Sequence, residues 1–363
     1  MTVYVGSLQY RPVFKSHCRA FGEQCERQGY HVKYLFSQSY EWMLPEEIRK
    51  KTVFIGNTTD IISMLIDASS YRNRKRIIKI FTEDSPTHIY MHNYHLLNHL
   101  IADLCGKQGS CFIQHVHEPY TENKKAHGSI NQYLISLSEH FQGRLLKKTD
   151  VAIVSSNLAS SLFDRRYPDF SGKKKVIPLM FEDLGDSVDN LQDRRYVTFV
   201  GPPVPAKGPE IFLEIIDYSN KNGLGFNFLL ISHSRIRDSK YHNKSNLELF
   251  QKPKITDAEF GKLIQRSLTV VTPYKRETQS SVIPVSYMYG TPVVSSDTGG
   301  LPEFVSHKNT GYLVKKDAGI EKWIQGIDFV RKNLPRMTAI CRNYFVEHFS
   351  GENWRKHLAD ILN

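Results

Sequence analysis

The sequence predicts an α/β protein made of two Rossmann-like domains, each built on a parallel β-sheet. Short apolar segments alternate with helical segments over residues 3–155, the rhythm of successive strand–helix–strand units. The alternation restarts near residue 197, after a polar stretch at residues 182–195 that has no apolar period. Loops at residues 201–208 and 273–305 carry the glycines and polar side chains that follow strands in such sheets.

Length and composition agree with this fold class. The 363 residues suffice for two domains, and 40% hydrophobic content with 23% charged residues fits a globular protein with a core. No apolar run reaches the ~20 residues that a membrane span needs, and residues 1–12 resemble a first strand rather than a signal peptide. The five cysteines are scattered without a C-x-x-C pair, which favours reduced thiols in a cytoplasmic protein.

The formal net charge is +11, and the basic runs lie in the first half of the chain, at residues 72–79, 144–148 and 173–175. Such runs indicate attraction to an anionic membrane surface, a phosphorylated acceptor or nucleic acid. Solvated helix faces and loops are the alternative. Because no nucleic-acid-binding motif accompanies the charge, we do not expect nucleic acid as a partner.

The first domain is expected over residues 1–182. The side chains of Phe14, Cys18, Phe21 and Cys25 recur at helical spacing and predict a helix over residues 12–29. The remaining segments alternate around it. Strands are predicted at 3–8, 31–36, 52–55, 88–92, 111–117, 150–155 and 176–179, and further helices near 60–79, 93–105 and 133–148.

A linker over residues 183–195 is expected to lead into a second domain over residues 196–346. Residues 232–250 are polar and irregular, which indicates an exposed insertion. The other segments resume the alternation. Strands are predicted at 197–200, 226–231, 268–271 and 293–294, and helices at 211–222, 256–266, 282–289, 320–330, 337–346 and 353–362.

Residues 273–305 carry the most informative pattern in the chain. Polar residues 278–281 precede an apolar helix. Gly290 is expected to end this helix, because glycine readily adopts the left-handed backbone conformation found after the last helical turn. Gly299 and Gly300 then allow the backbone to approach a ligand closely. Loops at the carboxyl ends of neighbouring strands, each leading to a helix N-terminus, suit an anionic ligand.

The order and spacing of these motifs resemble the nucleotide-binding core of the retaining glycosyltransferases of family 4, which have the GT-B fold. The motifs are Gly201 to Gly208 with Lys207, Glu277, GTPVV at 290–294, GGLPE at 299–303 and GYLV at 311–314. The resemblance implies two Rossmann-like domains facing each other across a cleft, the first on the acceptor side and the second binding the nucleotide sugar. It also implies a C-terminal helix, residues 347–363, that crosses back to the first domain.

The activity that this resemblance implies is that of a metal-independent, retaining hexosyltransferase with no cofactor beyond its donor. Such an enzyme moves a sugar from a UDP- or GDP-sugar to a glycan or lipid-linked acceptor, in the synthesis of cell-surface polysaccharides or glycoconjugates. We therefore expect a cytoplasmic protein, peripheral on the inner face of the cell membrane. The oligomeric state stays open.

Donor-binding residues follow from the match to the family motifs. Lys207 would offer a cation to phosphate, and Lys275 or Arg276 would supply the charge of the arginine that the family has where this chain has Pro202. Glu277 would accept hydrogen bonds from hydroxyls of the transferred sugar, which makes it a candidate catalytic residue. The other candidates share a loop or helix start beside these. They are Thr278, Gln279, Ser280, Ser281, Gly299, Gly300 and Glu303.

Each assignment has a structural alternative. Lys207 can be a surface lysine on a rigid turn, Glu277 a surface carboxylate and Glu303 a helix-start charge. His117, the second candidate catalytic residue, resembles the family's histidine near the transferred sugar and would contact the sugar or its developing charge. A structural histidine is the alternative, with Glu118 as another polar contact.

The sequence disfavours two further classes of site. His92 with His95, and His115 with His117, have spacings that suit a metal, but no Cys or carboxylate completes a ligand set in sequence. An NAD site is disfavoured because no G-x-G-x-x-G follows the first strand.

Two positions depart from the family pattern. Pro202 stands in the place of the usual arginine, and Val285 in that of the usual second glutamate. These departures motivate an alternative function, a GT-B-like binding or scaffold subunit with a degenerate donor site.

Overall fold

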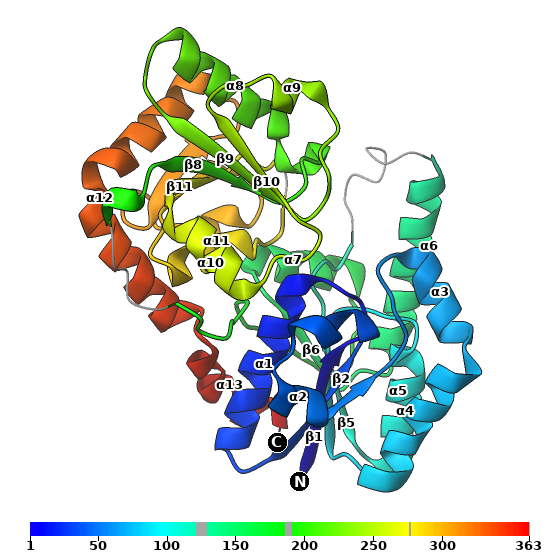
Figure 1. Cartoon of the computed structure of the whole chain (residues 1–363). Helices are drawn as coiled ribbons and strands as arrows, with labels where there is room; N and C mark the ends of the chain where they lie inside the picture. The colour runs from blue at the N-terminus through cyan, green and yellow to red at the C-terminus, as the bar shows by residue number, and fades with distance from the viewer. Residues whose placement is uncertain (121–128, 186–190, 276, 363) are drawn as a thin grey trace. The chain divides into compact units, whose positions relative to one another are not determined.

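The computed structural model describes residues 1–120, 129–185, 191–275 and 277–362 (Figure 1). The chain divides into two compact units. The first unit comprises Met1–Glu182 together with Ser350–Asn363, and the second comprises Asp183–Phe349. Both units are parallel sheets with helices packed on them, so the predicted α/β class with two Rossmann-like domains is confirmed. The expectation that the two sheets face each other across a cleft stays a prediction.

The first unit has a seven-stranded sheet in the order β3-β2-β1-β4-β5-β6-β7, in which every pair is parallel. The strands are β1 (Thr2–Ser7), β2 (His31–Phe36), β3 (Thr52–Phe54), β4 (His88–His92), β5 (Cys111–His115), β6 (Val151–Val154) and β7 (Lys173–Val176). The strand order reverses between β1 and β4. Ligands of open parallel sheets bind at such a switch point, outside the carboxyl ends of the strands.

Helices cover both faces of this sheet. They are α1 (Pro12–Arg27), α2 (Glu46–Lys50), α3 (Ile61–Ser69), α4 (Tyr71–Asp84), α5 (Asn98–Gln108), α6 (Ser129–Leu146) and α7 (Asn157–Arg166). Pro12 occupies the first turn of α1, where its missing N–H costs nothing. The predicted stripe of Phe14, Cys18, Phe21 and Cys25 is buried against the sheet.

The C-terminal segment belongs to the first unit, which confirms the predicted return of the chain. It forms a short 3₁₀ turn (Gly351–Trp354) followed by α13 (Arg355–Leu362). The Trp354 ring is buried, with its centroid 5.0 Å from that of Phe21 and 6.2 Å from that of Tyr90.

The second unit has a six-stranded parallel sheet in the order β10-β9-β8-β11-β12-β13. Its strands are β8 (Tyr196–Val200), β9 (Asn227–Ser232), β10 (Leu247–Gln251), β11 (Ser267–Thr272), β12 (Val293–Asp297) and β13 (Gly311–Lys315). Its helices are α8 (Pro209–Lys221), α9 (Ser239–His242), α10 (Asp257–Gln265), α11 (Val282–Met288) and α12 (Ile320–His348). Thr256 and Glu259 form a capping box at the start of α10, which begins where the sequence predicts a helix.

Several predicted elements were wrong. The strand expected at 176–179 is β7 (Lys173–Val176), whose residues pair in register with β6. The helix expected over residues 60–79 is two helices, because Ser70 is extended (φ −67°, ψ 116°) and caps α4 by accepting from the N–H of Asn73. Residues 232–250 are not an irregular insertion, since β10 begins at Leu247 and pairs with β9. The helices expected at 320–330 and 337–346 are one helix, α12, which runs through Pro335 because Leu334 and Met337 are buried on the continuing face.

The polar composition of the predicted linker indicates an exposed segment, but the linker is buried near its C-terminal end, at Arg194. Arg194 is buried, and its guanidinium donates to the Thr291 hydroxyl at 2.6 Å and to the Tyr289 carbonyl at 2.6 Å. Burial lowers the pKa of Arg194 to about 10. The end of the linker is therefore anchored beside the turn that follows α11. Residues 186–190 of the linker lie outside the described residues.

Candidate active site

Three loops of the second unit meet at the carboxyl ends of the adjacent strands β8, β11 and β12. The first holds residues 201–208, the second residues 273–281 and the third residues 298–300. Backbone contacts join them: the N–H of Lys275 donates to the Ala206 carbonyl at 2.9 Å, and the N–H of Gly300 donates to the Glu277 carbonyl at 2.9 Å. The structure thus brings the predicted donor-binding motifs together at one edge of the sheet.

Glycine is required at both loop contacts. Gly208 has φ +61°, and a Cβ there would lie 2.0 Å from the Pro273 carbonyl oxygen. Gly299 has φ +60°, and a Cβ there would lie 2.1 Å from the Glu277 carbonyl oxygen. A side chain at either position would be strained by the left-handed backbone and would also collide with the neighbouring loop. The close approach of Gly299 therefore fixes the backbone of Glu277.

Gly299→Ala is expected to destabilise the second unit by roughly 1–3 kcal/mol and to weaken binding of the nucleotide sugar that the motif resemblance implies, because the alanine Cβ displaces Glu277. Gly223→Ala is the matched control, since Gly223 has φ +60° but nothing within 4 Å of an added Cβ. Urea unfolding and donor titration of both variants measure the effects. If the two variants bound donor equally well, the Gly299 contact would have no part in holding the site.

Lys207 ends a 3₁₀ turn (Pro205–Lys207) in the first of these loops. Its ammonium donates to the Val200 carbonyl at 3.4 Å and lies 5.5 Å from the centroid of the Tyr274 ring. Burial lowers the pKa of Lys207, and the negative charge of Glu277 acts in the opposite direction. Lys207 and Glu277 therefore share one region, where a poorly hydrated cation can pair with phosphate.

The remaining predicted donor residues take varied positions. Thr278 and Gln279 are half-buried in the loop before α11, and the hydroxyl of the buried Ser280 accepts from the N–H of Val282 at 3.3 Å. Ser281 occupies the N-cap of α11 without a side-chain capping bond. Glu303 is exposed in a 3₁₀ turn (Leu301–Glu303) directly after the two glycines.

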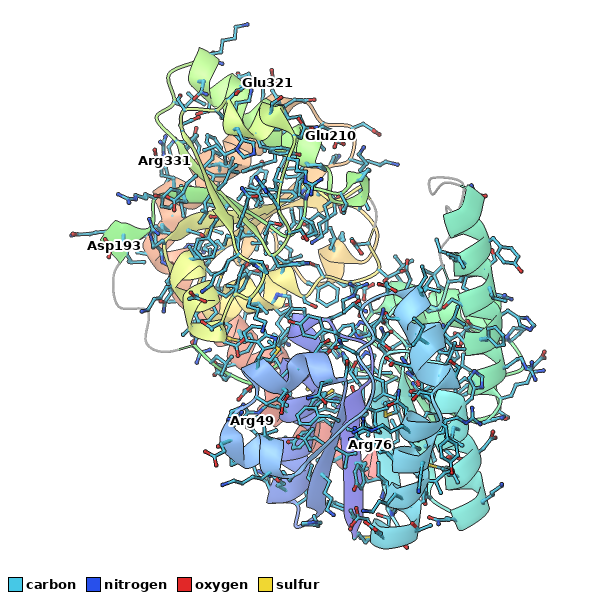
Figure 2. The ribbon with its side chains drawn as sticks, turned by 45° about the vertical axis from the view of Figure 1, so that its right-hand side comes forward. Arg49, Arg76, Asp193, Glu210, Glu321 and Arg331 are labelled. Atoms are coloured by element: carbon cyan, nitrogen blue, oxygen red, sulfur yellow. The ribbon has the colours of Figure 1, made fainter. Side chains whose placement is uncertain are left out.

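The charge expected to replace the family's arginine is not found in Lys275. The Lys275 ammonium pairs with the Glu210 carboxylate at 2.5 Å, and Glu210 lies on α8 (Figure 2). The other candidate, Arg276, lies outside the described residues.

In the first unit, His117 belongs to a cluster of histidines near the ends of β4 and β5. Its Nε2 lies 2.7 Å from Nε2 of His92, and the Tyr90 hydroxyl lies 2.7 Å from Nδ1 of His92 and 2.9 Å from Nδ1 of His115. Nε2 of His115 lies 2.7 Å from the Ser155 hydroxyl. A continuous hydrogen-bonded chain thus runs from Ser155 to His117, which the structure leaves half-buried.

His17 on α1 stacks on this cluster, with its ring centroid 4.7 Å from that of His92. Its Nδ1 lies 2.6 Å from the Met180 carbonyl oxygen. Burial lowers the pKa of His17 to about 4 and that of His115 to about 3. The pKa values of His92 and His117 are also lowered, mainly by burial and to a smaller extent by repulsion from neighbouring imidazoles. All four rings are therefore neutral at pH 7.

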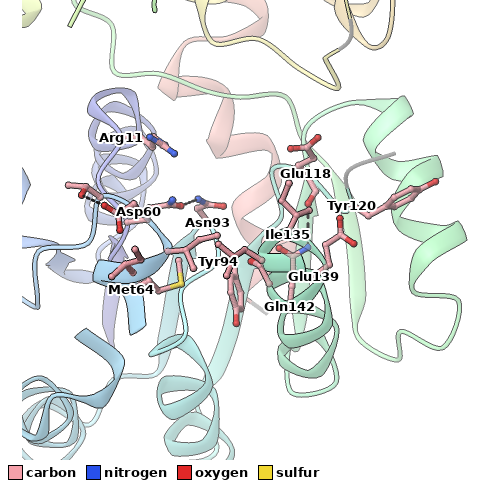
Figure 3. Close-up of a pocket in the computed structure, with 16 residues that line it drawn as sticks. Arg11, Asp60, Met64, Asn93, Tyr94, Glu118, Tyr120, Ile135, Glu139 and Gln142 are labelled. Carbon is pink, nitrogen blue, oxygen red and sulfur yellow. Dashed lines mark hydrogen bonds between the residues drawn. The ribbon is translucent and has the colours of Figure 1, made fainter. Parts of the chain in front are cut away.

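A pocket of about 530 Å³ opens beside this cluster, at the carboxyl ends of β1, β4 and β5. Figure 3 shows Arg11 and Asp60 on one side of it, and Glu118 and Glu139 on the other. Tyr94, which follows β4, also lines the pocket, together with five apolar side chains of α3 and α6. These are Ile61, Ile62, Met64, Leu134 and Ile135. The described lining combines carboxylates with apolar surface, a mixture that suits a small-molecule ligand.

Sequence reasoning missed this pocket and most of the histidine cluster. Tyr90 and His92 are two residues apart on β4, and His92 pairs in register with His115 on β5. The period of two was visible in the sequence, but the pairing of β4 with β5 was not. Asn93, which has φ +90° at the end of β4, hydrogen-bonds the side chain of Gln9 across the pocket floor.

In the described residues, no group of three or more His, Cys, Asp or Glu side chains is arranged to hold a metal ion. The search for a membrane-crossing helix, over the same residues, finds none with the necessary length and apolar character.

Comparison with known proteins yields one family and many solved structures. Residues 194–333 match the family model described as Glycosyl transferases group 1. No curated protein sequence matches the chain. The match to the family model lies entirely within the second unit, which holds Lys207, Glu277 and the two glycines.

Three solved structures illustrate the likeness. Sucrose-phosphate synthase from Thermosynechococcus elongatus aligns with a TM-score of 0.72 and 14% identity, covering 99% of this chain and 98% of that chain. Alr3699/HepE from Anabaena, in complex with UDP-glucose, aligns with a TM-score of 0.70 and 16% identity, covering 100% and 99%. The catalytic domain of Starch Synthase IV from Arabidopsis thaliana, bound to ADP and acarbose, aligns with a TM-score of 0.68 and 12% identity, covering 99% of this chain and 98% of that chain.

At these identities the likeness shows the fold. The chain has the GT-B fold over its whole length, and the predicted resemblance to glycosyltransferases of group 1 is confirmed. Membership of family 4 and retention of configuration stay predictions.

Proposed function

We propose that this protein is a retaining, metal-independent hexosyltransferase that moves a sugar from a UDP- or GDP-sugar to a glycan or lipid-linked acceptor. The observation that carries the proposal is the meeting of three loops in the second unit, where Gly299 and Gly300 hold Glu277 beside Lys207. Binding of UDP-glucose by the Anabaena protein of the same fold supports a nucleotide-sugar donor.

In this proposal the second unit holds the donor. Lys207 pairs with the diphosphate, and the backbone of Gly299 and Gly300 comes close to the nucleotide sugar. Glu277 accepts hydrogen bonds from hydroxyls of the transferred sugar and fixes its orientation. No cofactor and no metal take part. The remaining candidates, Arg276, Thr278 to Ser281 and Glu303, surround these groups in sequence.

The acceptor occupies the pocket of the first unit. Its described lining holds three carboxylates and one guanidinium, so the bound group carries hydroxyls rather than phosphate. The acceptor hydroxyl attacks the anomeric carbon on the face from which the diphosphate leaves, and a phosphate oxygen takes the hydroxyl proton. His117, neutral and directly preceding Glu118 of the lining, contacts the sugar as its charge develops.

The cellular role follows from the acceptor. A glycan or lipid-linked acceptor of this kind is used in the synthesis of cell-surface polysaccharides or glycoconjugates. The protein would then act in the cytoplasm, peripheral on the inner face of the cell membrane, where its basic runs attract anionic lipid.

The second candidate function is a GT-B-like binding or scaffold subunit. It is favoured by Pro202 and Val285, which remove two polar groups from the donor motifs, and by the engagement of Lys275 with Glu210. On α11, Val285 is half-buried and offers no hydrogen bond to a ribose.

Saturation-transfer NMR with UDP-, GDP- and ADP-sugars distinguishes the two functions. A glycosyltransferase is expected to show transfer to the sugar and base protons of one or more donors, with hydrolysis of that donor on long incubation. A scaffold subunit would show transfer to none. Binding without any hydrolysis or transfer to a glycan panel would contradict the catalytic function.

A further inference from the structure

An unusual concentration of exposed apolar side chains lies on α3 and α4. Ile62 (69% exposed), Leu65 (49%) and Ile66 (63%) lie on α3, and Tyr71 (78%) and Ile78 (43%) lie on α4. We call these residues, with the cations between them, the α3–α4 face. Large contiguous exposed apolar surface on a water-facing protein marks an interaction site.

Helical spacing explains why α3 exposes these residues. Ile62, Leu65 and Ile66 are three and four residues apart and share one face, while Met64 is buried on the opposite side. The two acids of this segment are engaged elsewhere. Asp60 caps α3 by accepting from the N–H of Ser63 at 2.9 Å, and Asp67 accepts from the N–H of Asn57 at 2.7 Å. The exposed face of α3 therefore carries no charge.

The next helix adds cations to this apolar face. Tyr71, Arg74, Lys75 and Ile78 follow the spacing i, i+3, i+4, i+7, so one stripe of α4 has apolar ends and two cations between them. Arg72 is exposed beside this stripe. These side chains differ from that of Arg76, which is half-buried and donates to the Phe54 carbonyl at 2.9 Å (Figure 2).

The α3–α4 face also reaches the pocket of the first unit. Ile62 belongs to the face and to the pocket lining at the same time. Leu134 and Ile135 of α6 line the pocket too, and Tyr133, directly before them, is 68% exposed. The pocket is thus bordered by exposed apolar and aromatic residues on two helices.

We propose that the α3–α4 face docks on an anionic lipid bilayer and places the pocket at the membrane surface, where it receives a lipid-linked acceptor. Ile62, Leu65 and Ile66 enter the boundary between headgroups and acyl chains, as the apolar face of an interfacial helix does. Arg72, Arg74 and Lys75 contact lipid phosphates. That the pocket receives a lipid-linked acceptor rests on the proposed function, whereas docking of the α3–α4 face on the bilayer does not.

The charges favour a bilayer over a second copy of this chain. Pairing two α3–α4 faces by a two-fold axis would bring Arg72, Arg74 and Lys75 of both copies together, and like charges across an interface oppose association. An anionic bilayer neutralises these cations while it takes up the apolar side chains.

The test is co-sedimentation of the full chain with vesicles of phosphatidylglycerol and phosphatidylcholine, compared with vesicles of phosphatidylcholine alone, at 0.15 M salt. Leu65→Ser/Ile66→Ser removes apolar surface without changing charge or the pocket lining, and is expected to weaken binding to the anionic vesicles at least tenfold. Val346→Ser, at a position 43% exposed in the second unit, is the matched control and should bind like the wild type.

The cations are tested separately. Arg74→Glu/Lys75→Glu is expected to weaken vesicle binding by about 25-fold or more, since each basic residue near an anionic surface contributes about fivefold. Arg235→Glu/Arg237→Glu, an equal charge reversal at exposed positions in the second unit, is the control. Thermal unfolding of each variant checks that the fold is retained.

Four outcomes overturn the proposal. These are equal binding to both vesicle types, no binding of the wild type, loss of binding in the control variants, and concentration-dependent self-association that Leu65→Ser/Ile66→Ser abolishes in the absence of vesicles. Vesicle binding by a protein that transfers no sugar would leave docking intact and refute the proposed function. Transfer of sugar to soluble glycans without vesicle binding would refute docking and leave the proposed function intact.

Discussion

Glu277→Gln is expected to lower kcat/KM for sugar transfer by about 10²–10³-fold, the effect of removing one well-placed polar group from a transition-state contact. The substitution keeps the size and shape of the side chain but removes the negative charge. That charge opposes the fall in the pKa of Lys207, so Glu277 and the ammonium that would hold the diphosphate are coupled. The hydroxyls of the transferred sugar would also lose their strongest acceptor.

The measurement is steady-state transfer with the donor identified by NMR, together with the dissociation constant of that donor. Glu321→Gln is the control, because Glu321 is an exposed carboxylate in the first turn of α12 (Figure 2). We expect the loss to fall mainly on kcat, since the contact strengthens as charge develops at the sugar. Full turnover by Glu277→Gln would refute the assignment of this residue.

The second large effect is acid destabilisation of the first unit between pH 6.5 and pH 4. The pKa of His17 falls from an ordinary value near 6.5 in the unfolded chain to about 4, because the ring is buried in the folded chain. The unfolded chain then binds more protons in this range, so stability is complete above pH 6.5 and declines as the pH falls. One such histidine removes on the order of 3 kcal/mol by pH 4.

Four neutral rings share this cluster, and burial lowers the pKa of each, so all four act on stability in the same direction. Urea unfolding at a series of pH values, followed by the fluorescence of the tryptophans, measures the slope. His17→Gln is expected to take up about one proton fewer on unfolding. His31→Gln, at an exposed position, is the control for the substitution itself. If the free energy of unfolding of His17→Gln and of the wild type changed with pH at the same slope, this account would be contradicted.

Sequence reasoning worked where the local pattern and the packing agree. The stripe from Phe14 to Cys25, the capping box at Thr256 and the glycine pair at Gly299 and Gly300 each set their own surroundings through spacing or backbone freedom. For this reason the two-domain fold and the meeting of the donor loops could be expected from the chain alone.

The errors arose where tertiary packing overrode local preference. Pro335 predicts the end of a helix, but burial of Leu334 and Met337 keeps α12 continuous through it. The basic run at residues 173–175 favours either an anion-binding surface or a solvated face, yet these residues lie in β7, in which Lys174 pairs with Asp164 and Lys175 with Asp360. Both outcomes depend on partners far away in sequence, which no local pattern specifies.

The histidine chain of the first unit has a consequence for the proton positions on His117. Tyr90 has one hydroxyl proton and faces Nδ1 of both His92 and His115. When Tyr90 donates to His115, His115 donates through Nε2 to Ser155, His92 donates to Tyr90, and Nε2 of His92 accepts the proton of His117.

When Ser155 donates to His115 instead, each hydrogen bond in the chain reverses and Nε2 of His117 becomes the acceptor. Neutral imidazoles allow only these two directions, because each ring carries a single proton. The tautomer of His117 is therefore coupled to the orientation of a serine hydroxyl at the end of β6, four hydrogen bonds away.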